Sequence, residues 1–260
     1  MPVSFEMQKT GETGTLSVLG PERLPEVLAL HNETRAMLPE EQKMFILPQT
    51  PSYFEKFLAQ NGSGLMLGAT VNGKLVAQLV LMGPITIEDA ISKRAVTRNE
   101  ITWHHVSPMD TIFAVKSVTV HPDFRGNGLS QRLLQAALEL PAMDAADHVF
   151  AQISAANMRS WELFLENGFG IVGAGIDPGD NKERFILQRP AQGFSFDMAP
   201  SADDVDPVGD FPAIVRLTQR GALIGRLDET GPKAHGQRRL AFSASAELSA
   251  SQPLAGAGIA

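Results

Sequence analysis

The chain has 260 residues, a formal net charge of −7 and 43% hydrophobic residues, and it contains no cysteine. This hydrophobic content can bury a sizeable core, and the length suits one large domain or a domain with an extension. The lack of cysteine excludes disulfides, a thiol nucleophile and a thiolate metal site. The acidic balance argues against nucleic acid as a partner, because phosphate binding needs a concentrated basic face.

The N-terminal residues, MPVSFEMQKT, lack the charged and then apolar pattern of a signal peptide. No apolar run approaches the roughly 20 residues that a membrane span needs. We therefore expect a cytoplasmic protein with no membrane partner.

The first part of the chain predicts a strand and two helices. Residues 14–19 have strand character, and a helix is expected to begin at Pro21 and to bury Leu24, Val27, Leu28 and Leu30. Residues 31–50 are expected to be a connection, and a second helix is expected to begin near Pro51. In this connection His31, Glu33, Glu40 and Glu41 are expected to be solvated, with contact to an amine as the alternative.

A hairpin and a long excursion are expected next. Leu65 to Val71 and Lys74 to Met82 flank Asn72-Gly73, which suits a type I′ turn. Residues 83–111 are longer than a hairpin connection needs, with a short helix expected around Ile87 to Lys93. This segment is either a lid over an acceptor site or an inert surface flap. Its chemistry-bearing residues are Glu100, His104, His105 and Asp110.

A strand, a glycine turn and a helix follow in the order IFAVKSVTV, Pro122, then Arg125-Gly126-Asn127-Gly128, with the helix ending before Pro141. The first N–H groups of a helix have no internal partner and carry the positive end of the helix dipole, so they can bind phosphate. A tight turn that only begins a helix would explain these residues equally well.

The wider pattern V-x-P-x-x-R-G-x-G, from Val120 to Gly128, together with a small residue at Ser130, resembles the acyl-CoA pyrophosphate loop of the GNAT superfamily of N-acyltransferases. Ser130 departs from the Gly or Ala that is usual there and adds a hydroxyl group. Downstream, Asn157 to Phe169 resembles the superfamily helix that starts with Asn and ends in Gly-Phe. With two motifs in the expected order, the chain is identified as a member of this superfamily.

The resemblance implies an α/β fold with a mixed, mostly antiparallel sheet that is flanked by helices and splayed at the acyl-CoA strand. It implies transfer of an acetyl or other short acyl group from CoA to a primary amine, by direct attack in a ternary complex and without a metal. The alternative is a regulatory domain that binds acyl-CoA without turnover. The residues implied to bind acetyl-CoA are Val118, Val120, Arg125, Gly126, Asn127, Gly128, Leu129, Ser130 and Asn157.

The chain departs from the superfamily at its catalytic groups. Many members carry a tyrosine on the second motif's helix to protonate the thiolate, and that position is Phe164; Tyr53 is the only tyrosine in the chain. Lys116 stands where some members have a carboxylate, on the same strand face as Val118, and is expected to be exposed, with contact to an acidic substrate as the alternative. Glu100, His104, His105 and Asp110 are candidate bases by chemistry alone. The acceptor stays open among small amines, peptide N-termini, lysine and antibiotics.

The rest of the chain predicts a closing sheet and an extension. Strands are expected at 148–154, 169–175 and 183–189. A helix is expected at 157–167, with Asn157 as its N-cap and a Schellman motif at Gly168-Phe169 ending it. We expect an acyl-CoA N-acyltransferase domain at residues 1–189, a linker and appended hairpin at 190–240, and a disordered tail at 241–260. The hairpin, from 214–218 and 222–227, is expected to extend a sheet edge or to pack on a partner chain in a homodimer.

Overall fold

The computed structural model describes residues 2–59, 63–86, 110–177, 182–190, 196–199, 223–227 and 240–244. Three candidate bases, Glu100, His104 and His105, lie outside the described residues. So do the short helix expected at 87–93 and the strand expected at 214–218.

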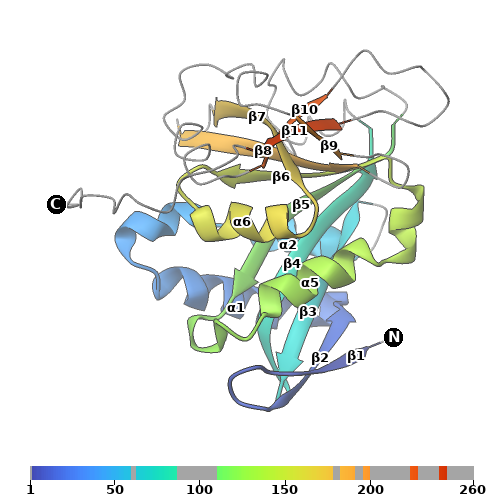
Figure 1. The fold of residues 1–260 in the computed structure, drawn as a ribbon. Coiled ribbons are helices and arrows are strands. Elements are labelled where there is room, and N and C mark those ends of the chain that lie inside the picture. Colours follow the sequence, from blue (N-terminus) through green and yellow to red (C-terminus); the bar gives the residue numbers. More distant parts are fainter. Residues whose placement is uncertain are drawn as a thin grey trace.

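The described strands form one sheet in the order β1-β2-β3-β4-β5-β6-β8-β7-β10-β11-β9 (Figure 1). Neighbouring strands are antiparallel except at three pairs, β5 with β6, β7 with β10 and β9 with β11. This confirms the expected mixed, mostly antiparallel sheet. The strand bounds are β1 Val3–Glu6, β2 Thr13–Val18, β3 Gly64–Val71, β4 Lys74–Ile85, β5 Ile112–Val120, β6 His148–Ser154, β7 Gly170–Asp177, β8 Lys182–Pro190, β9 Phe196–Ala199, β10 Leu223–Leu227 and β11 Leu240–Ala244.

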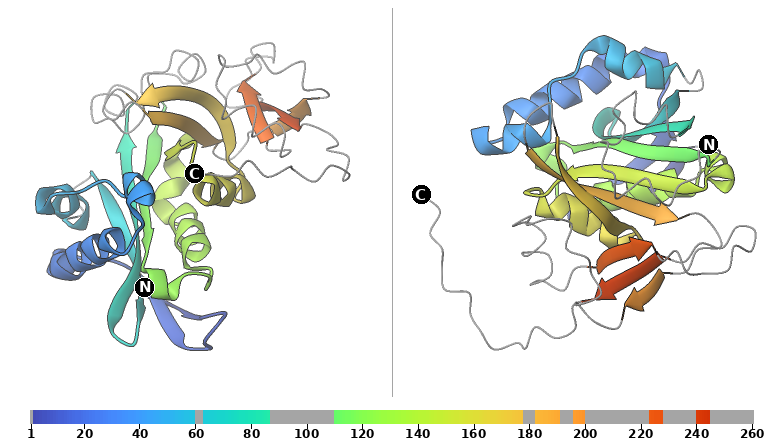
Figure 2. Two further views of the ribbon diagram at one scale, coloured as in Figure 1. Left: turned by 90° about the vertical axis from the view of Figure 1, so that its left-hand side faces the viewer. Right: turned by 90° about the horizontal axis from the view of Figure 1, so that it is seen from above.

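Helices cover both faces of the sheet, and Figure 2 (left) shows α1 and α2 on one side and α5 and α6 on the other. Strand residues alternate between the two faces, so each face has its own hydrophobic core. Phe54, Phe57 and Ile186 belong to the core under α1 and α2, and Trp161 and Phe185 to the core under α5 and α6. The helix bounds are η1 Pro21–Arg23, α1 Leu24–Ala36, η2 Glu40–Phe45, α2 Pro51–Leu58, η3 Pro122–Phe124, α5 Leu129–Leu138, η4 Pro141–Ala145 and α6 Met158–Glu166.

Two turns confirm the expected backbone chemistry. Asn72 and Gly73 both have positive φ, 49° and 79°, as a type I′ turn requires. At the end of α6 the N–H of Phe169 donates to the carbonyl of Phe164, and Gly168 has a φ of 80°. This is the six-to-one bond of the Schellman motif.

Two parts of the N-terminal region differ from expectation. Residues 31–36, expected in a connection, continue α1. The sequence HNETRA has few apolar residues, but a helix already nucleated by the preceding residues propagates cheaply through polar ones. Strand β1 was not expected, because four residues are too few to show the alternation of apolar and polar side chains that is typical of a strand. It pairs antiparallel with β2, with Val3 opposite Leu16.

The C-terminal strands extend the sheet beyond β7. β10 coincides with the expected strand at 222–227 and lies beside β7, with Ile224 opposite Ile171. Its antiparallel partner in the described chain is β11, at residues 240–244, where the start of a disordered tail was expected. Long-range pairing of this kind leaves no local turn signal in the sequence. The domain boundaries themselves stay a prediction.

Candidate active site

Strands β5 and β6 separate along their length. They pair in parallel from Ile112 opposite His148 to Val115 opposite Ala151, and the described ladder ends there. β5 continues to Val120 beside β4, while β6 continues to Ser154 beside β8. The peptide groups of β5 beyond Val115 therefore have no strand partner on the β6 side within the described sheet. Such groups are available to an extended ligand.

A β-bulge lies at the point of separation. Leu81 is opposite Val115 and Val80 is opposite Ser117, so Lys116 is an extra residue in β5. The bulge interrupts the regular alternation of side chains on which the expected shared face of Lys116 and Val118 rested. Lys116 is half-buried and lines the cavity described below, so it is not simply exposed.

The glycine loop joins β5 to α5. Gly126 and Gly128 have φ values of 78° and 71°, in the left-handed region that favours glycine. Within the described chain no hydrogen bond engages the N–H groups of Gly126, Asn127, Gly128, Leu129 or Ser130. These groups surround the N-terminus of α5. They form a set of donors that suits an anion.

The loop side chains divide into buried and exposed ones. Leu129 packs in the core and Asn127 is 2% exposed, so these two residues can offer a ligand their backbone only. The Asn127 amide donates to the carbonyl of Phe124 at 3.0 Å and stabilises the turn. Arg125 is exposed and Ser130 half-buried, so their side chains remain accessible.

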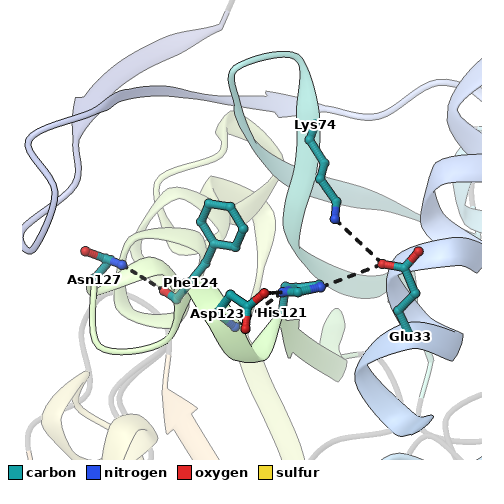
Figure 3. A network of polar contacts seen from close by, with 6 residues as sticks. All are labelled: Glu33, Lys74, His121, Asp123, Phe124 and Asn127. Atoms are coloured by element: carbon teal, nitrogen blue, oxygen red, sulfur yellow. Dashed lines mark hydrogen bonds and ion pairs between the residues drawn. The ribbon is translucent and has the colours of Figure 1, made fainter. Parts of the chain in front are cut away.

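A polar network connects the start of the loop to α1 (Figure 3). His121, which directly follows β5, is buried, and its Nδ1 accepts the N–H of Asp123 at 3.3 Å. Its Nε2 lies 3.7 Å from the carboxylate of Glu33, which is also 3.7 Å from the Lys74 ammonium group. Since Nδ1 accepts, Nε2 carries the proton that points to Glu33. The network fixes the direction in which the chain leaves β5.

A cavity of about 630 Å³ occupies the gap between β5 and β6. Its walls come from both faces of the sheet, so the separation of the strands connects the two sides of the molecule. The lining residues are His31, Met44, Phe45, Ile46, Leu47, Gln49, Tyr53, Lys56, Val115, Lys116, Ser117, Val118, Gln152, Ile153, Ser154, Asn157, Ser160, Phe164 and Arg184.

On the α6 side, the cavity is bounded by Asn157, Ser160 and Phe164. Asn157 is the residue before α6, but its side chain makes no capping hydrogen bond, so the expected capping role is wrong. The carbonyl of Asn157 instead accepts the N–H groups of Ser160 and Trp161. Its side chain, half-buried at the cavity wall, is placed to contact a ligand. Of the two strand residues expected to bind the cofactor, Val118 lines the cavity and Val120 is not among its lining residues.

On the α1 and α2 side, His31 lines the cavity and is only 2% exposed, which corrects the expectation that it is solvated. Its Nε2 lies 3.1 Å from the Leu47 carbonyl, so Nε2 donates there and Nδ1 is left as the acceptor. Nδ1 is buried with no hydrogen-bond partner in the described chain. Burial lowers the pKa of His31 below its ordinary 6.5, because the charged imidazolium loses hydration; the Leu47 carbonyl opposes this and Arg35 adds to it.

Tyr53 lies on the same side of the cavity as His31. Burial raises the pKa of Tyr53 to about 12, so its hydroxyl stays protonated at neutral pH. Lys56 lies over the Tyr53 ring, with its ammonium nitrogen 4.8 Å from the ring centroid. For His31, contact with an amine was only the alternative expectation, and Tyr53 was not expected at the site, although its position on the helix that follows His31 could have suggested it.

Asp110, the one described candidate base, is not at the cavity. It precedes β5, and its carboxylate lies 3.0 Å from Nε2 of the buried His148. His148 Nδ1 in turn accepts from the Gln188 amide at 2.7 Å. These residues join β5, β6 and β8 at the end of β5 away from the glycine loop, where the strands are still paired.

The site contains no metal centre in the described ranges, because no group of three or more His, Asp or Glu side chains gathers there. No helix in the described part of the chain is long and apolar enough to cross a membrane.

Residues 29–169 match the model of the Acetyltransferase (GNAT) family. The chain belongs to this family. The match spans more than half of the chain and includes the glycine loop and α6, so this GNAT chain is an enzyme of the acetyltransferase type. Comparison with curated protein sequences gives no match.

Solved structures share the fold of this GNAT chain at low sequence identity. The GNAT domain of S. lividans PAT has a TM-score of 0.51 and 14% identity, covering 72% of this chain and 96% of its own. Arabidopsis thaliana NAA60, solved in complex with acetyl-CoA, has a TM-score of 0.50 and 12% identity, covering 68% and 99%. The ribosomal-protein-S18-alanine N-acetyltransferase of Escherichia coli has a TM-score of 0.48 and 15% identity, covering 68% and 94%.

Proposed function

We propose that this protein transfers an acetyl or other short acyl group from CoA to a primary amine, by direct attack of the amine within a ternary complex. The observation that supports this most is that β5 lines the cavity from Val115 to Val118, beyond the end of its pairing with β6, and then leads directly into the glycine loop. The other motif of the family borders the same cavity at Asn157 and Phe164.

In this proposal the pyrophosphate of CoA binds the N–H groups from Gly126 to Ser130, and Arg125 adds a charge-assisted contact. The pantetheine arm extends along β5 and pairs with its backbone from Val118 toward the cavity. Asn157 contacts the arm from the opposite wall. The acetyl-CoA complex of Arabidopsis thaliana NAA60 belongs to the same fold and supports this choice of donor.

The reaction forms a bond between the amine nitrogen and the thioester carbon, and then breaks the bond from that carbon to sulfur. A backbone N–H near Val118 faces the carbonyl oxygen as negative charge develops on it. One such fixed donor is worth roughly 3 kcal/mol. The products are the amide and free CoA, with one proton lost by the amine.

The amine must be neutral to attack. An alkylamine of pKa about 10.4 is neutral in about one molecule per thousand near neutral pH, which costs on the order of 4 kcal/mol. In this proposal His31 is the general base that accepts the proton of the amine. It is the only described cavity residue whose ordinary pKa is near neutrality. Its Nδ1 lone pair also has no protein partner in the described chain. Since Nδ1 is buried, the proton reaches it through an ordered water.

Tyr53 donates a hydrogen bond to the departing sulfur in place of the tyrosine that Phe164 replaces. A full proton transfer is unfavourable, because a phenol of pKa about 12 is a weaker acid than a thiol of pKa about 8.5. A hydrogen bond still stabilises the thiolate as it leaves.

The test is free-thiol release from acetyl-CoA by the purified protein against a panel of amines, with calorimetric titration of acetyl-CoA. Gly128→Trp, which fills the loop, is expected to abolish both binding and turnover. Gly73→Trp is the matched control, because Gly73 also has positive φ, at 79°, and a Cβ there meets nothing within 4 Å. It carries the same backbone strain away from the loop and should keep both activities.

The second candidate is a regulatory domain that binds acyl-CoA without turnover, which the phenylalanine at position 164 favours. Binding that Gly128→Trp abolishes, with no thiol release on any amine, would support it. If the wild-type protein binds no acetyl-CoA, both functions are wrong.

A further inference from the structure

One wall of the cavity is apolar and belongs to neither hydrophobic core. Its residues follow one another at the end of η2 and just after it, and all of them line the cavity: Met44, Phe45, Ile46 and Leu47. We refer to this segment as the apolar wall. Its first three residues are half-buried and Leu47 is 48% exposed, and within the described chain none of the four joins either core. A run of apolar side chains that the fold does not bury marks a surface for binding.

Two side chains of α1 fix the backbone of the apolar wall. Arg35 Nε donates to the carbonyl of Ile46 at 3.1 Å, and His31 Nε2 donates to the carbonyl of Leu47 at 3.1 Å. Arg35 follows His31 by four residues, so the two side chains are neighbours on one face of α1. The wall is held through its carbonyl groups, and its apolar side chains do not have to pack in order to keep it in place.

The apolar wall lies beside the proposed general base. His31 lines the cavity and also bonds to Leu47, which is part of the wall. On α2, Tyr53 adds its ring to the same side of the cavity and packs edge-on against Phe54, with 5.1 Å between the ring centroids. An amine whose nitrogen approaches His31 therefore brings its carbon atoms next to the wall.

The polar part of the lining comes mainly from other elements. It includes Ser117 on β5, Gln152 and Ser154 on β6, and Asn157 and Ser160 at the start of α6. In the proposed function this part faces the pantetheine arm, which carries amide groups. The described lining includes neither Asp nor Glu, so no described carboxylate is there to bind the charge of a cationic amine. What the described lining offers the acceptor is contact between its carbon atoms and the wall.

We propose that the acceptor is a primary amine carried by an apolar carbon body, aliphatic or aromatic, which packs against the apolar wall while the nitrogen faces the thioester. This rests on the proposed acyltransferase function and deepens it, because it names the class of the acceptor. A free amine and a peptide with an apolar N-terminal residue share this chemistry. The cavity of about 630 Å³ is of a size that holds a small ligand, and in the proposed function it also takes the end of the pantetheine arm.

The apolar wall also acts on the reacting nitrogen. Contact with apolar surface removes water from the ammonium group, which disfavours the charged form and lowers the pKa of the bound amine. A larger fraction of the bound amine is then neutral and able to attack. The contact strengthens with each methylene group that the acceptor buries, by about 4-fold in kcat/KM per group.

The experiment measures thiol release from acetyl-CoA with a series of primary amines at one pH. Ethylamine, butylamine and hexylamine have nearly the same basicity and differ in apolar length only. We expect kcat/KM to rise about 10-fold or more from ethylamine to hexylamine. 5-Amino-1-pentanol is the matched probe, because a hydroxyl group replaces the terminal methyl group of hexylamine five carbons away from the nitrogen. Its kcat/KM should be about 10-fold or more below that of hexylamine.

Tetrapeptides that begin with Leu-Gly and Ser-Gly separate the two sources of the amine. A higher kcat/KM for the Leu peptide than for hexylamine assigns a peptide N-terminus, and the reverse order assigns a free amine. A Ser peptide that reacts better than the Leu peptide would contradict the inference.

Variants locate the effect. Met44→Gln and Leu47→Gln place an amide group in the apolar wall and should lower the ratio of kcat/KM for hexylamine to that for ethylamine about 3-fold or more. The affinity for acetyl-CoA should not change in calorimetry. Met37→Gln is the matched control, because Met37 follows α1, is 51% exposed and does not line the cavity. It should keep the ratio. Since these residues belong to neither core, all three variants should keep the wild-type unfolding temperature.

Equal kcat/KM along the amine series, or for 5-amino-1-pentanol and hexylamine, would overturn the inference and leave the acyltransferase function standing. So would an unchanged ratio in both wall variants. A changed elution volume of the wall variants in size-exclusion chromatography, without an effect of amine length, would assign the wall to a second copy of the chain instead. If no amine reacts, the proposed function fails, and calorimetric titration of hexylamine and 5-amino-1-pentanol into the protein with CoA present still decides whether the cavity prefers the apolar amine.

Discussion

The backbone N–H of Lys9 donates to the side-chain oxygen of Asn127 at 2.8 Å, across 118 residues of sequence. The Lys9 ammonium group also donates to the carbonyl of Arg125 at 3.1 Å. The turn between β1 and β2 thus holds the glycine loop from one side. The Asn127 side chain connects Lys9 to the loop, because its amide nitrogen also donates to the carbonyl of Phe124. The conformation of the glycine loop, and with it the direction of its N–H groups, therefore depends on the β1–β2 turn near the N-terminus.

Asn127→Leu tests this relationship. It removes the partner of the Lys9 N–H and of the Phe124 carbonyl, and because both hydrogen bonds are only part-buried, each costs about 0.5 to 1.5 kcal/mol of stability. We expect acetyl-CoA affinity to fall about 10-fold because the loop loses its fixed conformation. Asn167→Leu is the control: Asn167 bonds to the Gln131 side chain on α5 and to the Leu163 carbonyl on α6, and in the described chain it makes no hydrogen bond to residues 125–130. Calorimetry that shows equal loss of affinity in both variants would contradict a specific role for Asn127.

The glycine loop, α6 and the Asn-Gly hairpin could be predicted from the sequence because each depends on local backbone chemistry. Positive φ at Gly126 and Gly128 and the turn at Asn72 leave a signature within a few residues. The bulge at Lys116 could not be predicted, because it depends on the register with β4. Nor could the burial of His31, which depends on how far a polar helix extends.

His31 makes the stability depend on pH. Its pKa in the folded state is lowered, mainly by burial, so at acid pH the unfolded chain binds a proton more readily than the folded one. Stability is therefore present above pH 6.5 and is lost as pH falls below it, at up to about 1.4 kcal/mol per pH unit. Urea unfolding at pH 7.5 and 5.5 should show this loss, and His31→Gln should reduce it while keeping a donor for the Leu47 carbonyl. The same acidification should lower kcat/KM in the wild-type enzyme.

Asp110 is expected to be structural rather than catalytic. Asp110→Ala leaves Nε2 of the buried His148 without its carboxylate, so unfolding free energy should fall by about 1 to 3 kcal/mol. Asp110→Asn retains an acceptor oxygen and should cost less. In both variants kcat and KM of the folded enzyme should stay within about 2-fold of wild type. A large loss of kcat without loss of stability would return Asp110 to the catalytic candidates.

Tyr53→Phe tests the proposed hydrogen bond to the leaving sulfur. The ring keeps its edge contacts with Phe54 and Phe57, at 5.1 and 5.4 Å between centroids, so stability should change little. We expect kcat to fall about 10-fold, with the KM for acetyl-CoA unchanged, because the donor acts only as charge develops on sulfur. Since the pKa of Tyr53 is about 12, the ratio of wild-type to variant kcat should be constant from pH 7 to about pH 9.5.

Phe164→Tyr in the Tyr53→Phe background completes this test. Phe164 packs against Phe169, with 5.0 Å between ring centroids, and lines the cavity on the α6 side. A hydroxyl added there supplies a donor from the opposite wall, so part of the lost kcat should return. If Tyr53→Phe alone has wild-type kcat, the thiolate leaves without a hydrogen bond from this residue, and the recovery experiment should then show no gain either.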